Sequence, residues 1–365
     1  MRSNIVKILT TMLAILFCLG FGSACATTTE TTAAETTAAG ELVIGYVLPW
    51  GPVNPAIKAF TDTVSIWCEK EGVQLLKVVV GEDVEKQANA VRDFIAEGKV
   101  NGMVLIPVES DAMTSSVEEL NEANILVGCM DRVVSGGNVV GTVTAENYQA
   151  AVMIGEKAVE LLTERYGSPK GKVLELQGGL AAENIRLRMQ GFTDVLKNYP
   201  DIKLIQKPTE WDLGTAYNAT VDTLSANPDL DLIYWHSDYI ADSVMAAIDD
   251  SNRLFKRGED GHIIICEYDG QPIGLDYIRN GYADAAVNQP LLDYGFVVRF
   301  LKRAWEGNPI KVGEKVEADA YWSPAEVTAG VNGPEVLLAP LIIDLNNLDD
   351  PTLWGNSLEW EAPAE

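Results

Sequence analysis

The sequence predicts an α/β protein built from two doubly wound parallel-sheet lobes. Apolar strand-like runs alternate with segments of helical spacing from Glu41 onward, which is the pattern of a parallel sheet covered by helices on both faces. The same alternation repeats in the second half of the chain. At 365 residues the chain is also too long for one ordinary core and suits two.

The first unit contains four predicted strands and three predicted helices. Strand-like apolar runs occupy 42–48, 73–80, 102–107 and 125–130. Helical spacing of apolar residues occupies 56–70, 83–97 and 111–123. The second of these helices opens with an acidic cap, Asp83.

The second unit repeats this order. Strands are expected at 172–177, 202–208, 231–236 and 262–268. Helices are expected at 148–166, 184–198, 215–226, 238–250 and 273–280. LIPVESDA matches IYWHSDYI in position, and LVGCMDR matches IIICEYD. We interpret the repetition as a weak internal duplication.

The first 25 residues are expected to be a signal peptide. Arg2 and Lys7 precede a mostly apolar stretch, 8–21, that has signal-peptide length and is short for a membrane span. The small residues before Cys25 resemble a lipobox, although Gly22 occupies the position of its usual leucine. We expect secretion across the cytoplasmic membrane and lipid anchoring through Cys25. Plain secretion after cleavage at Ala24-Cys25-Ala26 and a retained anchor are the alternatives.

A Thr- and Ala-rich segment, 26–40, separates this signal from the predicted fold. It has no apolar face to bury, so we expect a disordered tether of the kind that holds a folded domain away from a membrane. The protein is therefore expected in the periplasm or at the cell surface.

The charge and the cysteines exclude several classes of function. With 27 Lys+Arg against 53 Asp+Glu, the net charge of -26 repels phosphate backbones, so nucleic acid is not an expected partner. Cys68, Cys129 and Cys266 are widely spaced in apolar surroundings, which predicts buried free thiols. No cofactor or metal is expected.

Polar residues that end apolar strands are the candidate binding residues, because ligands of open parallel sheets bind at the carboxyl ends of the strands. They are Asn54 after the first strand, Asp131 and Arg132 after 125–130, Ser237 and Asp238 after 231–236, and Asp269 after 262–268. Aspartate also caps helices, and this is the expectation for Asp238. No obvious helix follows Asp131, which favours a binding role there.

These residues lie in segments that resemble ribose-type sugar-binding proteins, the periplasmic binding proteins of the first structural type. The matching segments, in order, are NPAI, IPVESDA, NILVGCMDR, TVTAEN, LELQGG followed by RLRMQGF, EWD, NPDLDLIY and EYDGQP. The resemblance implies two lobes joined by a three-strand hinge. The first lobe would comprise 41–145 and 290–322, and the second 146–289 and 323–348.

The C-terminal residues extend beyond this resemblance. LIIDL resembles one further strand or a segment packed at the hinge, whereas we expect an acidic tail at 349–365. Trp354 and Trp360 are candidates for docking that tail on the surface.

The resemblance implies a ligand site for a polyhydroxylated ring. Its contacts would come from Asn54, Asp131, Arg132, Arg188, Trp211, Asp269 and Gln289. Carboxylates accept hydrogen bonds from ring hydroxyls, arginine donates them, and amides do both. Trp211 would supply one apolar wall and Trp50 the opposite wall. Core packing is the alternative for both tryptophans, and a surface position on a helix is the alternative for Arg188.

Four positions depart from the ribose pattern. Ala56 and Ile57 stand where that pattern carries two phenylalanines, and Ile106 and Ser237 stand where it carries asparagine. The space beside Ser237 is expected to be refilled by Trp235 and His236. These four departures argue against ribose itself as the ligand but remain compatible with another sugar.

Binding and transport explain the sequence better than catalysis or gene regulation. The chain has two histidines and lacks the HExxH, GxSxG and paired CxxC patterns, so no enzyme activity is expected. A sugar-responsive repressor would carry a helix-turn-helix in place of the signal and tether. The resemblance implies a monomer that delivers a monosaccharide or similar solute to the permease of an ABC importer. Presentation of the ligand to a chemoreceptor or sensor kinase is the alternative.

Overall fold

The computed structural model describes residues 40–51 and 54–358. The expected signal peptide, the lipidation site Cys25, the tether up to residue 39, and Trp360 lie outside the described residues. Within the described ranges, no helix is long and apolar enough to cross a bilayer.

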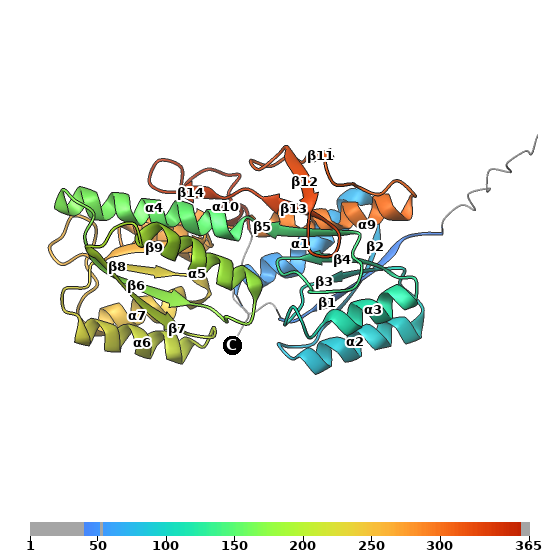
Figure 1. Ribbon diagram of the computed structural model, residues 1–365, viewed down its shortest axis with the longest axis horizontal. Helices are drawn as coiled ribbons and strands as arrows, with labels where there is room; N and C mark the ends of the chain where they lie inside the picture. Colours follow the sequence, from blue (N-terminus) through green and yellow to red (C-terminus); the bar gives the residue numbers. More distant parts are fainter. Residues whose placement is uncertain (1–39, 52–53, 359–365) are drawn as a thin grey trace, which may run out of the picture. The chain divides into compact units, whose positions relative to one another are not determined.

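The described strands form two sheets, and the first has the order β11-β12-β13-β5-β4-β3-β1-β2 (Figure 1). These strands are β1 (Val43–Leu48), β2 (Gln74–Val79), β3 (Gly102–Leu105), β4 (Leu126–Met130), β5 (Gly141–Ala145), β11 (Lys315–Val316), β12 (Ala325–Ala329) and β13 (Pro334–Leu338). Strands β1 to β5 pair in parallel. One face of this sheet carries α1 (Pro55–Glu71) and α9 (Val297–Trp305), and the 3-10 turn η2 (Leu291–Phe296) precedes α9. The other face carries α2 (Val84–Glu97) and α3 (Thr114–Glu122).

The second sheet has the order β14-β10-β9-β8-β6-β7. Its strands are β6 (Gly171–Gln177), β7 (Ile202–Pro208), β8 (Leu232–Trp235), β9 (Ile264–Asp269), β10 (Ala285–Asn288) and β14 (Leu341–Ile343). Helices α4 (Asn147–Tyr166) and α5 (Glu183–Leu196) cover one face. The other face carries α6 (Leu213–Ala226), α7 (Ala241–Asp250), preceded by the 3-10 turn η1 (Asp238–Ile240), and α8 (Pro272–Asn280).

The two sheets share one strand order, since β2-β1-β3-β4-β5 in the first corresponds to β7-β6-β8-β9-β10 in the second. This agrees with the internal duplication inferred from the sequence. Two mostly parallel sheets covered by helices confirm the predicted fold class.

Local signals place the helix boundaries that matter for the site. Helix α1 begins after Asn54, whose Oδ1 accepts from the Ile57 backbone N at 3.0 Å, and it ends at Gly72 with φ 67°. Helix α2 begins in the same way after Asp83, which accepts from the Lys86 N at 2.9 Å. The expected acidic cap is therefore present.

The assignment of 323–348 to the second lobe is wrong for β12 and β13. Strand β13 pairs in parallel with β5, and Val336 lies opposite Val143 in the first sheet. The side chains of Val327, Val336 and Leu338 are buried in the core of that sheet. Only β14 pairs with the second sheet, antiparallel to β10. The strands therefore change sheet after Leu338 rather than near residue 323.

The expectation of an acidic tail from residue 349 is wrong for the described part, 349–358. A short helix, α10 (Trp354–Ser357), forms there, and Leu353 and Trp354 are buried. The free energy gained by burying these apolar side chains outweighs the preference of the acidic residues for solvent, so the segment packs against the protein. Trp354 is therefore a core residue rather than a residue docked on the surface.

The three cysteines in the described ranges are free and buried, as predicted. Burial raises the pKa of Cys68 and of Cys129 to about 12, which keeps both as inert thiols at neutral pH.

Candidate ligand-binding cavity

A cavity of about 320 Å³ lies where the carboxyl ends of strands from both sheets meet. Residues next to the first sheet that line it are Trp50, Ala56, Ile57, Phe60, Glu82, Asp131 and Arg132. Residues next to the second sheet are Asn184, Ile185, Arg188, Glu210, Trp211, Asp212, Ser237, Tyr239 and Asp269. Gln289, on the connection from β10 to η2, and Leu291, the first residue of η2, complete the lining.

A larger and more open concavity, of about 1130 Å³, lies at the amino ends of strands in the second sheet. Several of its charged side chains already pair with one another, for example His262 Nε2 with Asp284 Oδ2 at 3.0 Å and Lys172 Nζ with Asp229 Oδ1 at 2.6 Å. The carboxyl-end cavity is the stronger candidate, because its polar groups are buried and come from both sheets.

Asp131 and Arg132 follow β4 directly and are both buried. Asp131 has φ 62°, a left-handed conformation that is uncommon for a residue with a side chain. Arg132 Nε lies 3.7 Å from Asp131 Oδ2, and Arg132 Nη1 donates to the Val108 carbonyl at 2.8 Å. Burial raises the pKa of Asp131, while Arg132 and Arg188 oppose that rise. A buried acid and base are thus presented side by side at this strand end.

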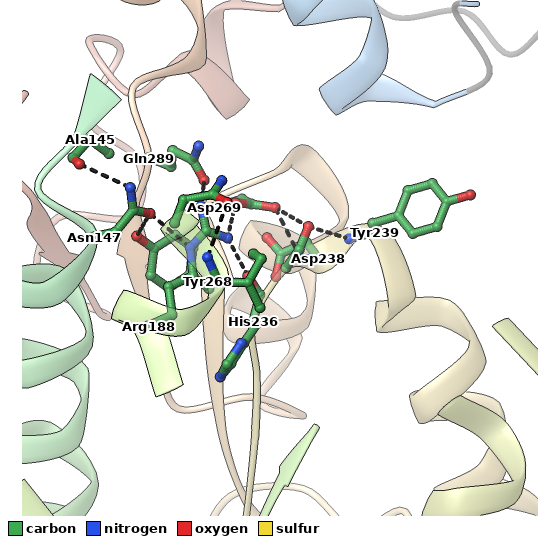
Figure 2. A network of polar contacts seen from close by, with 12 residues as sticks. Ala145, Asn147, Arg188, His236, Asp238, Tyr239, Tyr268, Asp269 and Gln289 are labelled. Carbon is green, nitrogen blue, oxygen red and sulfur yellow. Dashed lines mark hydrogen bonds and ion pairs between the residues drawn. The ribbon is translucent and has the colours of Figure 1, made fainter. Parts of the chain in front are cut away.

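Arg188 on α5 is the centre of a hydrogen-bonded network (Figure 2). Its Nε donates to Asn147 Oδ1 at 2.9 Å, Nη1 to the His236 carbonyl at 2.5 Å, and Nη2 to Gln289 Oε1 at 2.7 Å. Its guanidinium also lies 3.8 Å from the centre of the Tyr268 ring. The side chain is 3% exposed, so the alternative of a surface position is wrong.

Asp269 ends β9 and faces Arg188, with Oδ1 4.0 Å from Nη1. Asp269 Oδ2 accepts from Ser237 Oγ at 2.5 Å and from the Asp238 backbone N at 3.2 Å. Burial raises the pKa of Asp269 to about 6, although Arg188 and Ser237 lower it. Its carboxyl oxygens are therefore fixed in direction before any ligand arrives.

Asp238 does not cap the helix that follows it, which corrects the expectation from sequence. Its Oδ1 accepts from Trp235 Nε1 at 2.9 Å and its Oδ2 from the Gln271 N at 2.9 Å. Ser237 is the cap, since its Oγ accepts from the Tyr239 N at 3.1 Å. Burial and the neighbouring Asp269 hold the pKa of Asp238 well above its usual range.

Two tryptophans line the cavity as expected. Trp50 packs on Phe60 with ring centres 5.7 Å apart, and the Arg132 guanidinium lies 5.1 Å from the Trp50 ring centre. Trp211 occupies a turn with φ 62° and packs against Gly178, where an added Cβ would lie 2.0 Å from Trp211 Cζ2. Gly178 therefore provides the space in which the indole lies.

Three predicted contributors are absent from this lining. Asn54 is occupied as the cap of α1, because it directly precedes a helix. Trp235 is buried in the core of the second sheet. His236 is fully buried, with Nε2 2.8 Å from Glu175 Oε1. The space beside Ser237 is therefore not refilled by these two aromatic side chains.

The eight other predicted residues line one cavity, and their contact with a ligand stays a prediction. Ala56 and Ile57, which the sequence comparison with the ribose pattern singled out, also line it. Sequence reasoning missed the other lining residues, of which Phe60 and Asn184 are the most informative. Asn184 lies one helical turn before Arg188 on α5, so helical spacing could have identified it. Phe60 lies one turn beyond Ala56 on α1 and lines the cavity. It supplies an aromatic ring one turn away from the position at which this chain has alanine and the ribose pattern has phenylalanine.

Two similar parallel sheets with a cavity lined from both are the architecture of a solute-binding protein, and comparison with known proteins agrees on this class. Residues 44–308 match the family described as periplasmic binding protein domain, and the chain belongs to this family. The family consists of binding proteins, and its name places them outside the cytoplasm.

Several relatives are named as import binding proteins. The D-apiose import binding protein of Paraburkholderia graminis is 30% identical over 73% of this chain and 81% of the relative. The ribose import binding protein of Escherichia coli is 24% identical over 73% of this chain and 83% of the relative.

Solved structures share the fold. An ABC transporter solute binding protein from Mycobacterium smegmatis with bound glycerol superimposes with a TM-score of 0.71 at 24% identity, covering 86% of this chain and 97% of that chain. A galactofuranose binding protein gives a TM-score of 0.70 at 23% identity, covering 85% and 96%.

Proposed function

We propose that this protein captures a monosaccharide, or a similarly small polyhydroxylated solute, outside the cytoplasmic membrane and delivers it to an ABC importer. The proposal rests on a row of buried polar side chains along one cavity. Gln289 is hydrogen-bonded to Asp131 and to Arg188, and Arg188 faces Asp269. Each of these groups can exchange a hydrogen bond with a ring hydroxyl. The relatives named for D-apiose and ribose import support this class of ligand.

The size of the cavity supports a small ligand. Its volume of about 320 Å³ is at the lower end of the roughly 300–1,000 Å³ usual for small-molecule sites. Trp50 and Trp211 offer apolar faces, while the carboxylates and arginines supply directional contacts. A single sugar ring needs both kinds of surface.

The proposed mechanism is capture by closure, without a covalent step or a metal. Asp131 and Arg132 belong to the first sheet, and Arg188 and Asp269 to the second. A ligand that bonds to both sets favours the arrangement that brings them together, because it makes better contacts there. The hinge would comprise the three connections at which the strands change sheet, after Ala145, Asn288 and Leu338.

Delivery to a permease follows from the same proposal. The relatives are named import proteins, which supports transport over presentation to a sensor. We further propose that the protein acts as a monomer, and that Cys25 carries a lipid anchor which keeps it near the permease.

A thermal-shift screen of sugars, polyols, nucleosides and amino acids tests the ligand class. A ligand at about 100 times its Kd stabilises the folded state by about 2.7 kcal/mol through mass action, which raises the melting temperature. We expect a monosaccharide to give the largest shift, with calorimetry confirming one site. Shifts from an amino acid or nucleoside alone would refute the sugar assignment.

A further inference from the structure

The segment 344–358, here called the C-terminal strap, contacts the turn that carries Asp269. It begins after β14 and lies beyond the residues that match the family, 44–308. Leu348 and Leu353 are buried in the core under α6 to α8 of the second sheet. Trp354 belongs to the apolar core of the first sheet, and Leu358 packs against that core. The strap is therefore anchored on both cores.

The turn after β9 has an unfavourable backbone. Asp269 has φ 116° and Gly270 has φ 73°. A residue with a side chain rarely adopts the first of these values and keeps it only where the surroundings hold it. The direction of the Asp269 carboxylate therefore depends on the groups that hold this turn.

The strap supplies two of those contacts. Trp354 Nε1 donates to the Asp269 carbonyl at 2.8 Å, and the bond is buried. Gly355 lies against the next peptide, since a Cβ there would be 2.2 Å from the Gly270 carbonyl oxygen. The third contact is the Gln289 N, which donates to the same Asp269 carbonyl at 3.1 Å.

We propose that Trp354 is a positioning residue that sets the Asp269 carboxylate for the ligand through the backbone of this turn. The inference rests on the proposed function, because the benefit of a fixed carboxylate is ligand affinity. If the turn rotated, Asp269 Oδ2 would leave the donors Ser237 Oγ and Asp238 N. The strap would thus support the binding site through residues that do not line the cavity.

Two variants test this inference. Trp354→Phe keeps an aromatic ring but removes the N–H donor, and Gly355→Ala places a methyl group against the Gly270 carbonyl. The control is Trp305→Phe, which removes an exposed indole N–H bond of the same kind away from the cavity, from Nε1 to the Gly40 carbonyl at 2.9 Å. Ligand affinity is measured by calorimetry with the sugar found in the screen. Amide exchange of Gln271 is measured by NMR without ligand.

We expect Trp354→Phe to raise Kd about three- to tenfold, the loss expected from one buried hydrogen bond. Trp305→Phe should leave Kd unchanged. In an Asp269→Asn background, Trp354→Phe should cost little, because its effect passes through Asp269. In the ligand-free protein, the Gln271 amide, which donates to Asp238 Oδ2, should exchange faster in both strap variants.

The inference is overturned if Trp354→Phe binds as tightly as the wild type, or if Kd rises while the Gln271 amide exchanges at the wild-type rate. If the wild-type protein binds no sugar, the proposed function fails separately. The exchange experiment still decides whether the strap holds the turn, since an unchanged rate in both variants would refute that role as well.

Discussion

Gln289 donates from Nε2 to Asp131 Oδ1 at 3.1 Å, so a residue on the connection after β10 bonds to a residue that follows β4 in the other sheet. The same side chain accepts from Arg188 Nη2 at 2.7 Å through its carbonyl oxygen. One amide therefore joins the acid of the first sheet to the base of the second.

Gln289→Ala should weaken ligand binding strongly. It would leave Arg188 Nη2 and Asp131 Oδ1 buried without this partner, and breaking a buried charged set costs about 2 to 5 kcal/mol, roughly 30-fold or more in affinity. Calorimetry would measure the change. Gln190→Ala, on an exposed position of the same helix as Arg188, is the control and should bind normally. Equal affinity of both variants would contradict the role of Gln289.

Asp131→Ala should be the most damaging single substitution in the cavity. It removes an acceptor for ring hydroxyls and leaves Arg132 and Arg188 as buried cations with less compensation. We expect a loss of about 2 to 5 kcal/mol of binding free energy. Asp93→Ala, on the exposed face of α2, is the matched control. A tenfold or smaller loss would show that Asp131 is not a principal contact.

The fold could be predicted well because apolar periodicity and cap residues are local signals. Most predicted strands and helices are present within a few residues of the expected limits. The membership of 325–338 could not be predicted in the same way, because pairing of β13 with β5 is a long-range choice between two sheet edges. Burial of Trp354 was missed for a different reason, since the acidic composition of the segment conceals two core residues.

In the candidate site, too, residues with a local sequence signal could be predicted, whereas residues placed by long-range packing could not. Residues directly after a strand, such as Asp131 and Asp269, could be found because parallel strands bring their carboxyl ends together. Asn54 also follows a strand but is the cap of α1, so a polar residue after a strand can serve as a helix cap instead of lining the cavity. Phe60 carries no strand-end signal, and only the packing of α1 brings it to the cavity. Glu82 lies shortly after β2 and was overlooked although it has that signal.

Gly178→Ala should reproduce the binding defect of Trp211→Ala. Truncation of Trp211 removes an apolar wall, which we expect to cost on the order of 1 to 3 kcal/mol. The added methyl group at Gly178 would lie 2.0 Å from Trp211 Cζ2 and force the indole to move. Gly40→Ala, where the new methyl group meets open space, is the control. Calorimetry should show similar losses for the first two variants. Normal binding by Gly178→Ala would mean that the indole is not a ligand wall.

The pH dependence of stability and of ligand affinity should identify Asp269 as a titrating residue of the binding site. Burial raises its pKa from 3.8 to about 6, so the folded state binds a proton over that interval while the unfolded state does not. This contribution to stability is present at low pH and is lost as the pH rises through about 6. Ligand affinity should change in the opposite direction, because only the ionised carboxylate accepts from two hydroxyls at once.

Two measurements check this prediction. Calorimetry from pH 5 to 8, in buffers of different ionisation enthalpy, should show tighter binding above pH about 6 with proton release near that value. Asp269→Asn should reduce this dependence without abolishing it, because burial also raises the pKa of Asp131. A pH profile identical in the variant and the wild type would exclude Asp269 as the titrating contact.

Ligand should contract the protein in solution. The polar contacts come from both sheets, and the chain passes from one sheet to the other at three places, so closure needs rotation only near Ala145, Asn288 and Leu338. Small-angle scattering with saturating sugar should show a smaller radius of gyration than without it. Asp131→Ala, at a sugar concentration that saturates only the wild type, should keep the larger value. An unchanged radius in the saturated wild type would refute closure, because a ligand shifts a conformational equilibrium only through contacts that differ between the two states.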